Sequence, residues 1–380
     1  MTTMRRGAAR RRRAIRGPAT PSEIGHQRDT VITARGQTSE CQSIGAGMKP
    51  PTIYSIAREL GLSPSTVSRA LNESSLVKPD TRERVLKEAS RLGYVQNFQA
   101  RALRRSSTGM IGVLIPDLTS EVFNVLVSSI QLELNERDYG LIIGQSLNDP
   151  ELDRRYALAF QSQMVDGILH APCTPRGVDD AFSGAVHPPV VEIIRQSEND
   201  SRYSICMDDE GDAALATKHL IGRGYTRIYV VLGPEEFSTA RLRGRGAVAA
   251  AQSSPEVSVV LCHGSYSEEW GYQQGARIAG ELSSGEATAV LVTSNSFMAG
   301  VMGALSDRGV SIPDDLGLAA MEDPSWFRVA KPPVTSVSGQ TRELGRIASA
   351  TILELIEGRE PQGPRRRVLH GMLRERESTR

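Results

Sequence analysis

The stretch TIYSIARELGLSPSTVSRALNESSLVKPDTRERVLKEASRLGY, from Thr52 to Tyr94, contains three short segments with the apolar spacing of amphipathic helices. In the first segment, apolar side chains recur three and four positions apart, at Ile53, Ile56, Ala57 and Leu60. Gly61 is expected to end this helix, and Ser63 and Pro64 suit the cap and the first position of a second one. The inner face of the second helix would carry Val67, Ala70 and Leu71. Two short helices joined at a glycine indicate a helix-turn-helix.

A third helix is predicted from Pro79 to Leu92, with its end at Gly93. Its buried face would carry Val85, Leu86, Ala89 and Leu92. Three short helices are enough for a minimal core, so the stretch is expected to be a small all-α domain.

Beyond Gly109 the pattern changes to short β-rich runs that alternate with helical segments. The runs are Met110–Pro116, Leu141–Gln145, Gly167–Pro172, Pro189–Ile194, Ile228–Gly233, Val257–Cys262, Ala289–Thr293 and Leu316–Met321. Such alternation predicts parallel sheets with helices on both faces. About 270 residues of this pattern suggest an α/β core of two doubly wound lobes. Ligands of such sheets collect beyond the carboxyl ends of the strands, here the crevice between the lobes.

The near-neutral net charge of +1 conceals a polarised chain. Residues 1–47 sum to +6, residues 48–105 sum to another +6, and the remaining 275 residues sum to −11. A basic first part is expected to meet a polyanion such as DNA, while the acidic remainder stays away from it. Residues 1–47 lack apolar periodicity and indicate a disordered basic arm. Alternatively, translation begins at Met48, just before the first periodic segment.

Several classes of protein do not fit the sequence. The four cysteines, Cys41, Cys173, Cys206 and Cys262, lie far apart, so we expect no metal site and no disulfide framework. No apolar run approaches a membrane span and no secretory signal follows the basic start, so the expected compartment is the cytoplasm, with the protein on the nucleoid. The sequence has no glycine-rich nucleotide-binding loop and no recognisable arrangement of nucleophile and base. We therefore expect that the protein is not an enzyme and binds no cofactor.

The stretch from Thr52 to Asn97 resembles the headpiece of the lac repressor (LacI/GalR-type) family. The resemblance continues to the end of the chain through IGVLIPDL, VDGIL, HLIGRGYTRIYVVLGP, ARLRGRGA, SIPDDLGL, PPVTSV and RESTR. It implies a headpiece at 48–95, a hinge helix and linker at 96–109, and a periplasmic-binding-protein-like core at 110–380. It also implies a homodimeric transcription regulator, expected to be a repressor, on a palindromic operator. A small effector, expected to be a carbohydrate, would control its affinity for DNA.

Position by position, the resemblance assigns DNA contacts along the headpiece and the hinge. The residues are Thr52, Tyr54, Pro64, Ser65, Thr66, Ser68, Arg69, Asn72, Asn97, Ala100 and Leu103. Ser68 and Arg69 would lie on the groove-facing side of the second helix. Arg69 is the expected base contact, because an arginine donates two hydrogen bonds to a guanine edge; outside this motif it would be interpreted as a solvated surface residue. Leu103 matches the family's minor-groove wedge, although an isolated leucine usually belongs to a core.

For the effector, the resemblance assigns residues around the crevice. They are Asp117, Phe123, Arg195, Arg243, Asn295, Ser296 and Trp326. Arg243 matches the family's ligand-gripping arginine, whereas Ser296 replaces the aspartate of an Asn-Asp pair. Two arginines without that carboxylate suggest an anionic ligand, such as a sugar acid or sugar phosphate. Phe123 and Trp326 would stack on a sugar ring, or else simply pack between strand and helix.

Two other interpretations of the core stay open. In one, the altered crevice has lost its small effector and the regulator responds to a protein partner. In the other, the chain is a solute-binding protein, which the helix-turn-helix argues against. The absence of a carboxyl-terminal heptad helix favours a dimer over a tetramer.

Overall fold

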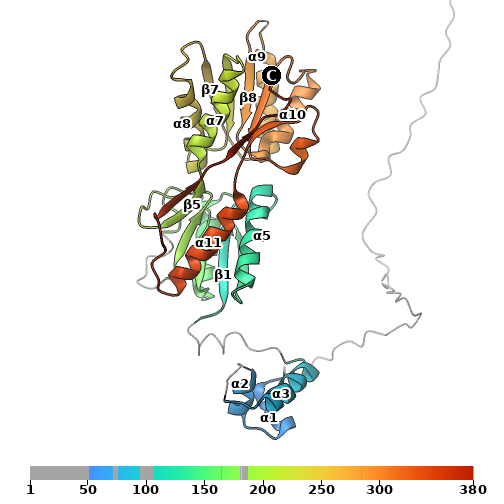
Figure 1. Cartoon of the computed structure of the whole chain (residues 1–380), viewed down its shortest axis with the longest axis vertical. Coiled ribbons are helices and arrows are strands. Elements are labelled where there is room, and N and C mark those ends of the chain that lie inside the picture. The colour runs from blue at the N-terminus through green and yellow to red at the C-terminus, as the bar shows by residue number, and fades with distance from the viewer. Residues whose placement is uncertain are drawn as a thin grey trace, which may run out of the picture. The chain divides into compact units, whose positions relative to one another are not determined.

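The computed structural model describes residues 51–71, 76–94, 107–163, 165–179, 181, 187–283 and 285–379. The chain divides into two compact units, Met1–Val95 and Gln96–Arg380, and each is described by itself (Figure 1). The predicted basic arm and residues 96–106 of the predicted hinge region lie outside the described residues.

The first unit is the predicted three-helix domain. Its helices are α1 (Ile53–Leu60), α2 (Pro64–Leu71) and α3 (Pro79–Leu92). A single apolar cluster holds them together, with Ile56, Ala57, Val67, Ala70, Val85 and Ala89 buried in it. Helices α1 and α3 both end at a glycine in the left-handed region, Gly61 at φ 64° and Gly93 at φ 66°, a conformation that glycine adopts without strain.

One predicted core residue of this unit is wrong. The Leu86 side chain is 45% exposed, whereas its neighbour Val85 is fully buried. Successive helical residues are about 100° apart, so only one of two adjacent apolar side chains can point straight into so small a core.

The second unit contains two six-stranded sheets, one in each lobe. The first-lobe sheet has the order β11-β5-β4-β3-β1-β2. Its strands are β1 (Met110–Ile115), β2 (Gly140–Gln145), β3 (Gly167–His170), β4 (Val190–Ile193), β5 (Tyr203–Met207) and β11 (Arg366–Leu369). The second-lobe sheet has the order β12-β10-β9-β8-β6-β7. Its strands are β6 (Arg227–Leu232), β7 (Ser258–His263), β8 (Thr288–Val292), β9 (Gly317–Met321), β10 (Thr335–Ser338) and β12 (Met372–Arg374).

Helices cover the sheets of both lobes, as Figure 1 shows. The first lobe has α5 (Glu121–Asn135), α6 (Pro150–Ser162) and α11 (Thr341–Ile356). The second has α7 (Asp209–Gly222), α8 (Ser238–Ala251), α9 (Glu268–Glu281), α10 (Met298–Asp307) and the 3₁₀ turns η1 (Asn295–Phe297) and η2 (Ser325–Arg328). Strand pairing is parallel except between β10 and β12. This is the doubly wound, two-lobed α/β arrangement expected from the sequence.

Four strands were not predicted: β5, β10, β11 and β12. Strand β11 has the sequence RRVL at a sheet edge and alternates exposed and half-buried residues. A strand so short and so charged lacks the apolar signal of the buried central strands.

The chain passes between the lobes at three places, after β5, β10 and β11. Side chains join these crossings: His370 Nδ1 lies 2.8 Å from Asp208 Oδ2, and Gln340 Nε2 donates to the His370 carbonyl at 2.8 Å. The three connections therefore form one hydrogen-bonded hinge.

Within the described part of the chain, no helix is both long and apolar enough to cross a membrane. The same residues contain no cluster of His, Cys, Asp and Glu suited to a metal ion. Cys173, Cys206 and Cys262 are buried free thiols.

Candidate functional site

Helix α2 presents an exposed row of the predicted DNA-contacting residues. Ser63 Oγ accepts a hydrogen bond from the Thr66 backbone N–H at 3.1 Å, which caps the first turn. Ser65 and Arg69 are exposed, and Pro64 and Thr66 are half-buried. On α1, the cap residue Thr52 is exposed and Tyr54 is 67% exposed. The structure thus brings most of the described headpiece candidates to the surface of two adjoining helices.

Ser68 is the exception. Its side chain is buried beside Val67 and Ala70, so its predicted groove-facing position is corrected. A serine is small enough to be buried in so thin a core. Four further candidates, Asn72, Asn97, Ala100 and Leu103, lie outside the described residues.

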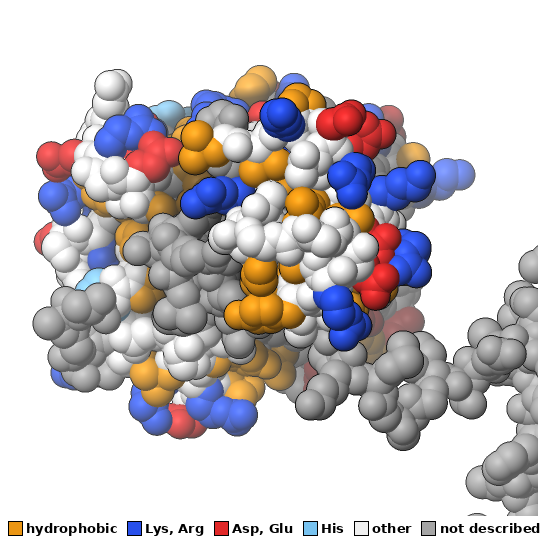
Figure 2. All heavy atoms as spheres, turned by 90° about the horizontal axis from the view of Figure 1, so that it is seen from below, with side chains coloured by type: hydrophobic (Ala, Val, Ile, Leu, Met, Phe, Trp, Pro, Cys, Tyr) orange, Lys and Arg blue, Asp and Glu red, His pale blue; other side chains and the backbone are white. Residues whose placement is uncertain are grey.

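The charge of the headpiece is positive but not concentrated. Its described residues hold seven Lys or Arg and four Asp or Glu. Figure 2, a view of the whole chain from below, shows blue Lys and Arg side chains dispersed among acidic and apolar ones. A net positive charge supports general attraction to the phosphates of a nucleic acid.

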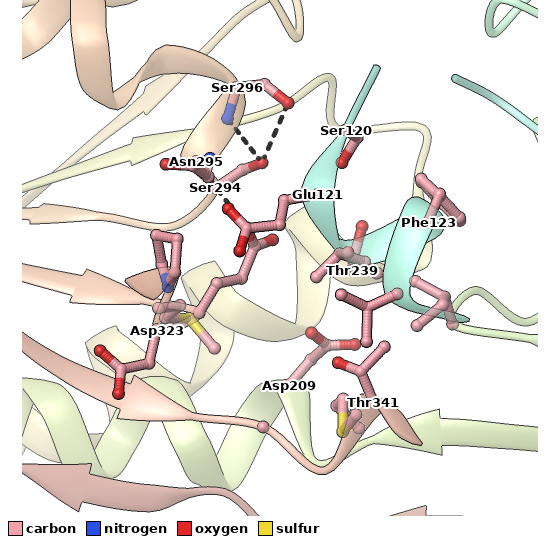
Figure 3. A pocket seen from close by; sticks show the side chains of 18 of the residues that line it. Ser120, Glu121, Phe123, Asp209, Thr239, Ser294, Asn295, Ser296, Asp323 and Thr341 are labelled. Atoms are coloured by element: carbon pink, nitrogen blue, oxygen red, sulfur yellow. Dashed lines mark hydrogen bonds between the residues drawn. The ribbon is translucent and has the colours of Figure 1, made fainter. Parts of the chain in front are cut away.

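A cleft of about 480 Å³ opens between the two lobes of the second unit, at the carboxyl ends of their strands. Its walls come from the segments that follow β1, β2, β4 and β5 in the first sheet and β8, β9 and β10 in the second, together with α8. This volume is in the range of small-molecule sites, and the position is the one that doubly wound sheets favour. Figure 3 shows side chains from both lobes converging on the space.

Six of the seven predicted effector residues line this cleft: Asp117, Phe123, Arg195, Arg243, Asn295 and Ser296. Trp326 is not among the lining residues. It lies on η2 and packs edge-to-face on Phe327, with ring centroids 4.6 Å apart. The alternative of simple packing therefore describes Trp326, whereas Tyr266, which was not predicted, adds an aromatic ring to the cleft.

Arg243 of α8 forms a buried ion pair in the cleft wall. Its Nε donates to Asp209 Oδ1 at 2.7 Å, and its Nη1 donates to the Thr293 carbonyl at 2.5 Å. Burial opposes the charge of Arg243, but nearby Asp209, Tyr266 and Glu322 outweigh it and raise its pKa. Burial also raises the pKa of Asp209, and Arg243 partly offsets that shift. Much of the guanidinium is therefore already used by the protein itself.

Arg195, two residues beyond the end of β4, is 4% exposed and has no carboxylate ion-pair partner among the described residues. Its Nη1 donates to Asn148 Oδ1 at 2.8 Å, and its guanidinium lies 3.9 Å from the centroid of the Phe237 ring. Burial lowers its pKa. Stacking and a hydrogen bond thus hold this side chain rigidly at the base of the cleft.

Glu322 is a cleft residue that sequence reasoning missed. It directly follows β9, in the position that the end of the LGLAAM run already marks as the edge of a sheet. Its Oε2 accepts from the Asn295 backbone N–H at 3.1 Å. Burial raises the pKa of Glu322, while Arg243 and the Asn295 N–H act in the opposite direction.

Two residues of the cleft have a left-handed backbone, Ile194 at φ 63° and Glu322 at φ 69°. Ile194 directly follows the last residue of β4, and Glu322 directly follows the last residue of β9. A branched isoleucine is strained at positive φ, and such strain is concentrated at binding sites. It supports a binding role for the strand ends.

Asp212, in the first turn of α7, connects the cleft with the hinge. Its Oδ1 accepts from the Gly371 N–H at 2.8 Å, and a Cβ at Gly371 would lie 2.6 Å from the other carboxylate oxygen. Burial raises the pKa of Asp212 to about 6. This carboxyl therefore titrates in a range where an exposed aspartate is already fully charged.

Replacing Asp212 with Asn is expected to change the pH dependence of stability. Between about pH 4 and pH 6 the folded chain binds more protons at Asp212 than the unfolded chain, so stability falls as the pH rises through that window. Asparagine can still accept from Gly371 but does not titrate. The variant should lose this slope and gain up to about 3 kcal/mol in free energy of unfolding at pH 7. Urea unfolding at pH 4, 5, 6 and 7 measures this; an unchanged slope would contradict it.

Comparisons with known proteins match both units of the chain. The family model "Bacterial regulatory proteins, lacI family" matches residues 52–97, and the model "Periplasmic binding protein-like domain" matches residues 217–379. The regulator GalS of Salmonella typhimurium is 28% identical over 305 residues, which cover 80% of this chain and 89% of GalS. The ribose operon repressor of Bacillus subtilis is 29% identical over 308 residues, 80% of this chain and 92% of that repressor.

Solved structures show the same fold. The structure of the lac repressor dimer bound to operator and an anti-inducer matches with a TM-score of 0.77 and 24% identity. The match covers 87% of this chain and 99% of the lac repressor chain. A repressor of the lacI family from Corynebacterium glutamicum covers 72% of this chain at 26% identity, with a TM-score of 0.61. The relatives are DNA-binding transcription regulators, not enzymes, and this chain has their helix-turn-helix headpiece and two-lobed periplasmic-binding-protein-like core. The chain therefore combines a lacI-family helix-turn-helix domain with a periplasmic-binding-protein-like domain.

Proposed function

We propose that this regulator is a repressor whose affinity for its operator is controlled by a small effector bound in the cleft between the lobes. The observation that carries the proposal is that cleft, which both lobes line and which holds a rigid Arg195, the Arg243–Asp209 pair and Glu322. Binding there affects how the lobes close around the ligand. Several relatives are named as repressors, including the ribose operon repressor.

For DNA binding, we propose a homodimer on a palindromic operator, placing the protein on the nucleoid in the cytoplasm. Arg69 and Ser65 would read bases, and Thr52, Tyr54, Pro64 and Thr66 would hold the backbone. The headpiece would span 48–95, the hinge 96–109 with Asn97, Ala100 and Leu103, and the core 110–380. A dimer of the lac repressor on its operator supports this arrangement by similarity of fold.

The body of the effector is proposed to be rich in hydroxyl groups. The cleft combines the aromatic side chains Phe123 and Tyr266 with many hydrogen-bond acceptors, the composition that suits a sugar ring. The regulator CelR was solved with cellobiose, and a related protein from Alkaliphilus metalliredigens with D-xylulofuranose. Arg195 and Arg243 alone suggested a sugar acid or a sugar phosphate. Carboxylates outnumber arginines along the cleft, so the lining favours a ligand without negative charge.

Control would operate through the hinge that joins the lobes. A ligand that binds the closed core better than the open one shifts the population toward the closed core by no more than its difference in affinity. The three hydrogen-bonded crossings at Asp208, Gln340 and His370 would transmit that change to the dimer and the hinge helices.

The experiment is footprinting of the full chain on the DNA upstream of its own gene, with and without small molecules extracted from the source bacterium. A protected palindrome whose protection changes with the extract supports the proposal. If protection responds only to a protein fraction of the lysate, the regulator has a protein effector instead.

A further inference from the structure

The lining of the cleft is strongly acidic. Three arginines face it, Arg195, Arg243 and Arg342. Seven carboxylates also line it: Asp117, Glu121, Asp209, Asp212, Glu322, Asp323 and Glu343. A concave site with walls of one charge attracts ligands of the opposite charge.

Most of these carboxylates already have a partner in the protein. Asp209 pairs with Arg243 at 2.7 Å, Asp323 with Arg376 at 2.8 Å, and Glu343 with Arg346 at 2.6 Å. Asp117 accepts from the backbone N–H of Thr119, and Asp212 from that of Gly371. Within the described residues, four lining carboxylates have no ion pair: Asp117, Asp212, Glu121 and Glu322. Asp117, Asp212 and Glu322 each accept a backbone hydrogen bond, whereas none is described for Glu121.

Glu121 and Glu322 belong to opposite walls of the cleft. Glu121 lies in the first turn of α5 in the first lobe, and Glu322 follows β9 in the second lobe. The negative charge of Glu121 is close enough to contribute to the raised pKa of Glu322. In Figure 3, Glu121 extends toward Ser294 and Asn295. The backbone N–H of Asn295 donates the hydrogen bond to Glu322. The two carboxylates are therefore close enough to repel one another across the cleft.

The protein compensates the charge of Glu322 only in part: the nearby charge of Arg243 lowers its pKa, but no side chain is described as donating a hydrogen bond to it. Glu322 receives one backbone hydrogen bond through Oε2. Beside it, the buried Oδ1 of Asn295 has no hydrogen-bond partner. Unpaired acceptors in a partly buried site are costly unless a ligand supplies donors.

We propose that the effector carries a cationic donor group, such as an ammonium on an amino sugar, which lies between Glu121 and Glu322. This inference rests on the proposed function, because it concerns the ligand of the same cleft. An ammonium has three donors and no acceptor, so it offers hydrogen bonds to both carboxylates at once. It also removes the repulsion between the walls, so one group accounts for both binding and closure.

The test uses the full chain on its footprinted operator. The metabolite extract is separated by ion exchange at pH 7 into cationic, neutral and anionic fractions, and each is added while operator affinity is followed by fluorescence anisotropy. The cationic fraction is expected to contain the activity. Glucosamine and N-acetylglucosamine are added in parallel as a cationic and a neutral probe of similar shape.

Variants locate the binding group. Glu121→Gln and Glu322→Gln should each weaken the response to the active fraction about tenfold or more. Circular dichroism and urea unfolding of each variant show that it folds. Glu269→Gln, an exposed residue of α9 outside the cleft, is the matched control.

The outcomes separate the two proposals. Activity confined to the neutral or anionic fraction overturns the cationic ligand but leaves effector control standing. A cationic activity that both glutamine variants retain overturns the placement between Glu121 and Glu322. No activity in any fraction contradicts effector control itself, and with it the cationic ligand.

Discussion

Replacing Arg243 with Ala is expected to lower the free energy of unfolding by about 3–5 kcal/mol and to abolish the response to the effector. The substitution leaves the buried carboxylate of Asp209 without its 2.7 Å partner and the Thr293 carbonyl without a donor. Breaking one side of a buried pair costs more than the pair contributes, because the remaining charge stays out of water. Urea unfolding followed by circular dichroism measures the loss of stability, and operator release measures the response.

Arg245 provides the matched control on the same helix. It pairs with Glu210 at 3.4 Å, but both side chains are largely exposed, so Arg245→Ala should change stability by about 1 kcal/mol or less. The double variant Arg243→Ala with Asp209→Ala should be more stable than the sum of the two single losses predicts, because it leaves no unpaired charge. Strict additivity would contradict a direct ion pair.

A loss of effector response in Arg243→Ala is informative only if the chain still folds. Circular dichroism and urea unfolding supply that check for the effector core, whereas operator affinity without ligand reports on the headpiece, which has its own core around Ile56, Val67 and Val85. Retained operator binding with a lost response would agree with two separate sites. Equal loss of both would contradict them.

Elements with a strong local signal could be predicted from the sequence. The ends of α1 and α3 follow from Gly61 and Gly93, because few other residues adopt the left-handed conformation found there. The central strands follow from runs such as MIGVLI, which are apolar because both of their faces are covered. The fold class needed only this alternation of buried strands and amphipathic helices.

Details that depend on tertiary packing could not be predicted. Ser68 is buried and Leu86 is 45% exposed, although polarity alone indicates the reverse, because the position around the helix axis decides. Strand β11 forms only because β5 presents a free edge to it. In such cases the neighbour, not the residue's own type, determines the structure.

The candidate cleft shows the same division. Resemblance brought six lining residues together, but it could not reveal that Arg243 is already paired with Asp209 or that Trp326 packs on Phe327. An arginine whose ion-pair partner is not evident from the sequence suggests an anionic ligand. Once its partner is known, the unpaired Glu121 and Glu322 determine the charge that the ligand should carry.

Replacing Arg69 with Ala is expected to weaken specific operator binding by about 1–3 kcal/mol, roughly 5- to 150-fold in Kd. The side chain is exposed in the last turn of α2, and its pairing with a guanine edge would be lost. The loss should fall on one base pair of each half-site, so an operator already altered at that pair should show little further change. Anisotropy titrations with a set of single-pair operator variants measure this.

Salt dependence distinguishes a base contact from a phosphate contact. Loss of one phosphate contact weakens binding to every sequence and reduces the salt slope by about 1, whereas loss of a base contact changes discrimination more than slope. Arg91→Ala is the control, because Arg91 pairs with Glu88 on the exposed side of α3 and its removal should leave discrimination intact. If Arg69→Ala instead weakens all operators and random DNA equally, Arg69 binds the backbone, and sequence reading must belong to Ser65 and its neighbours.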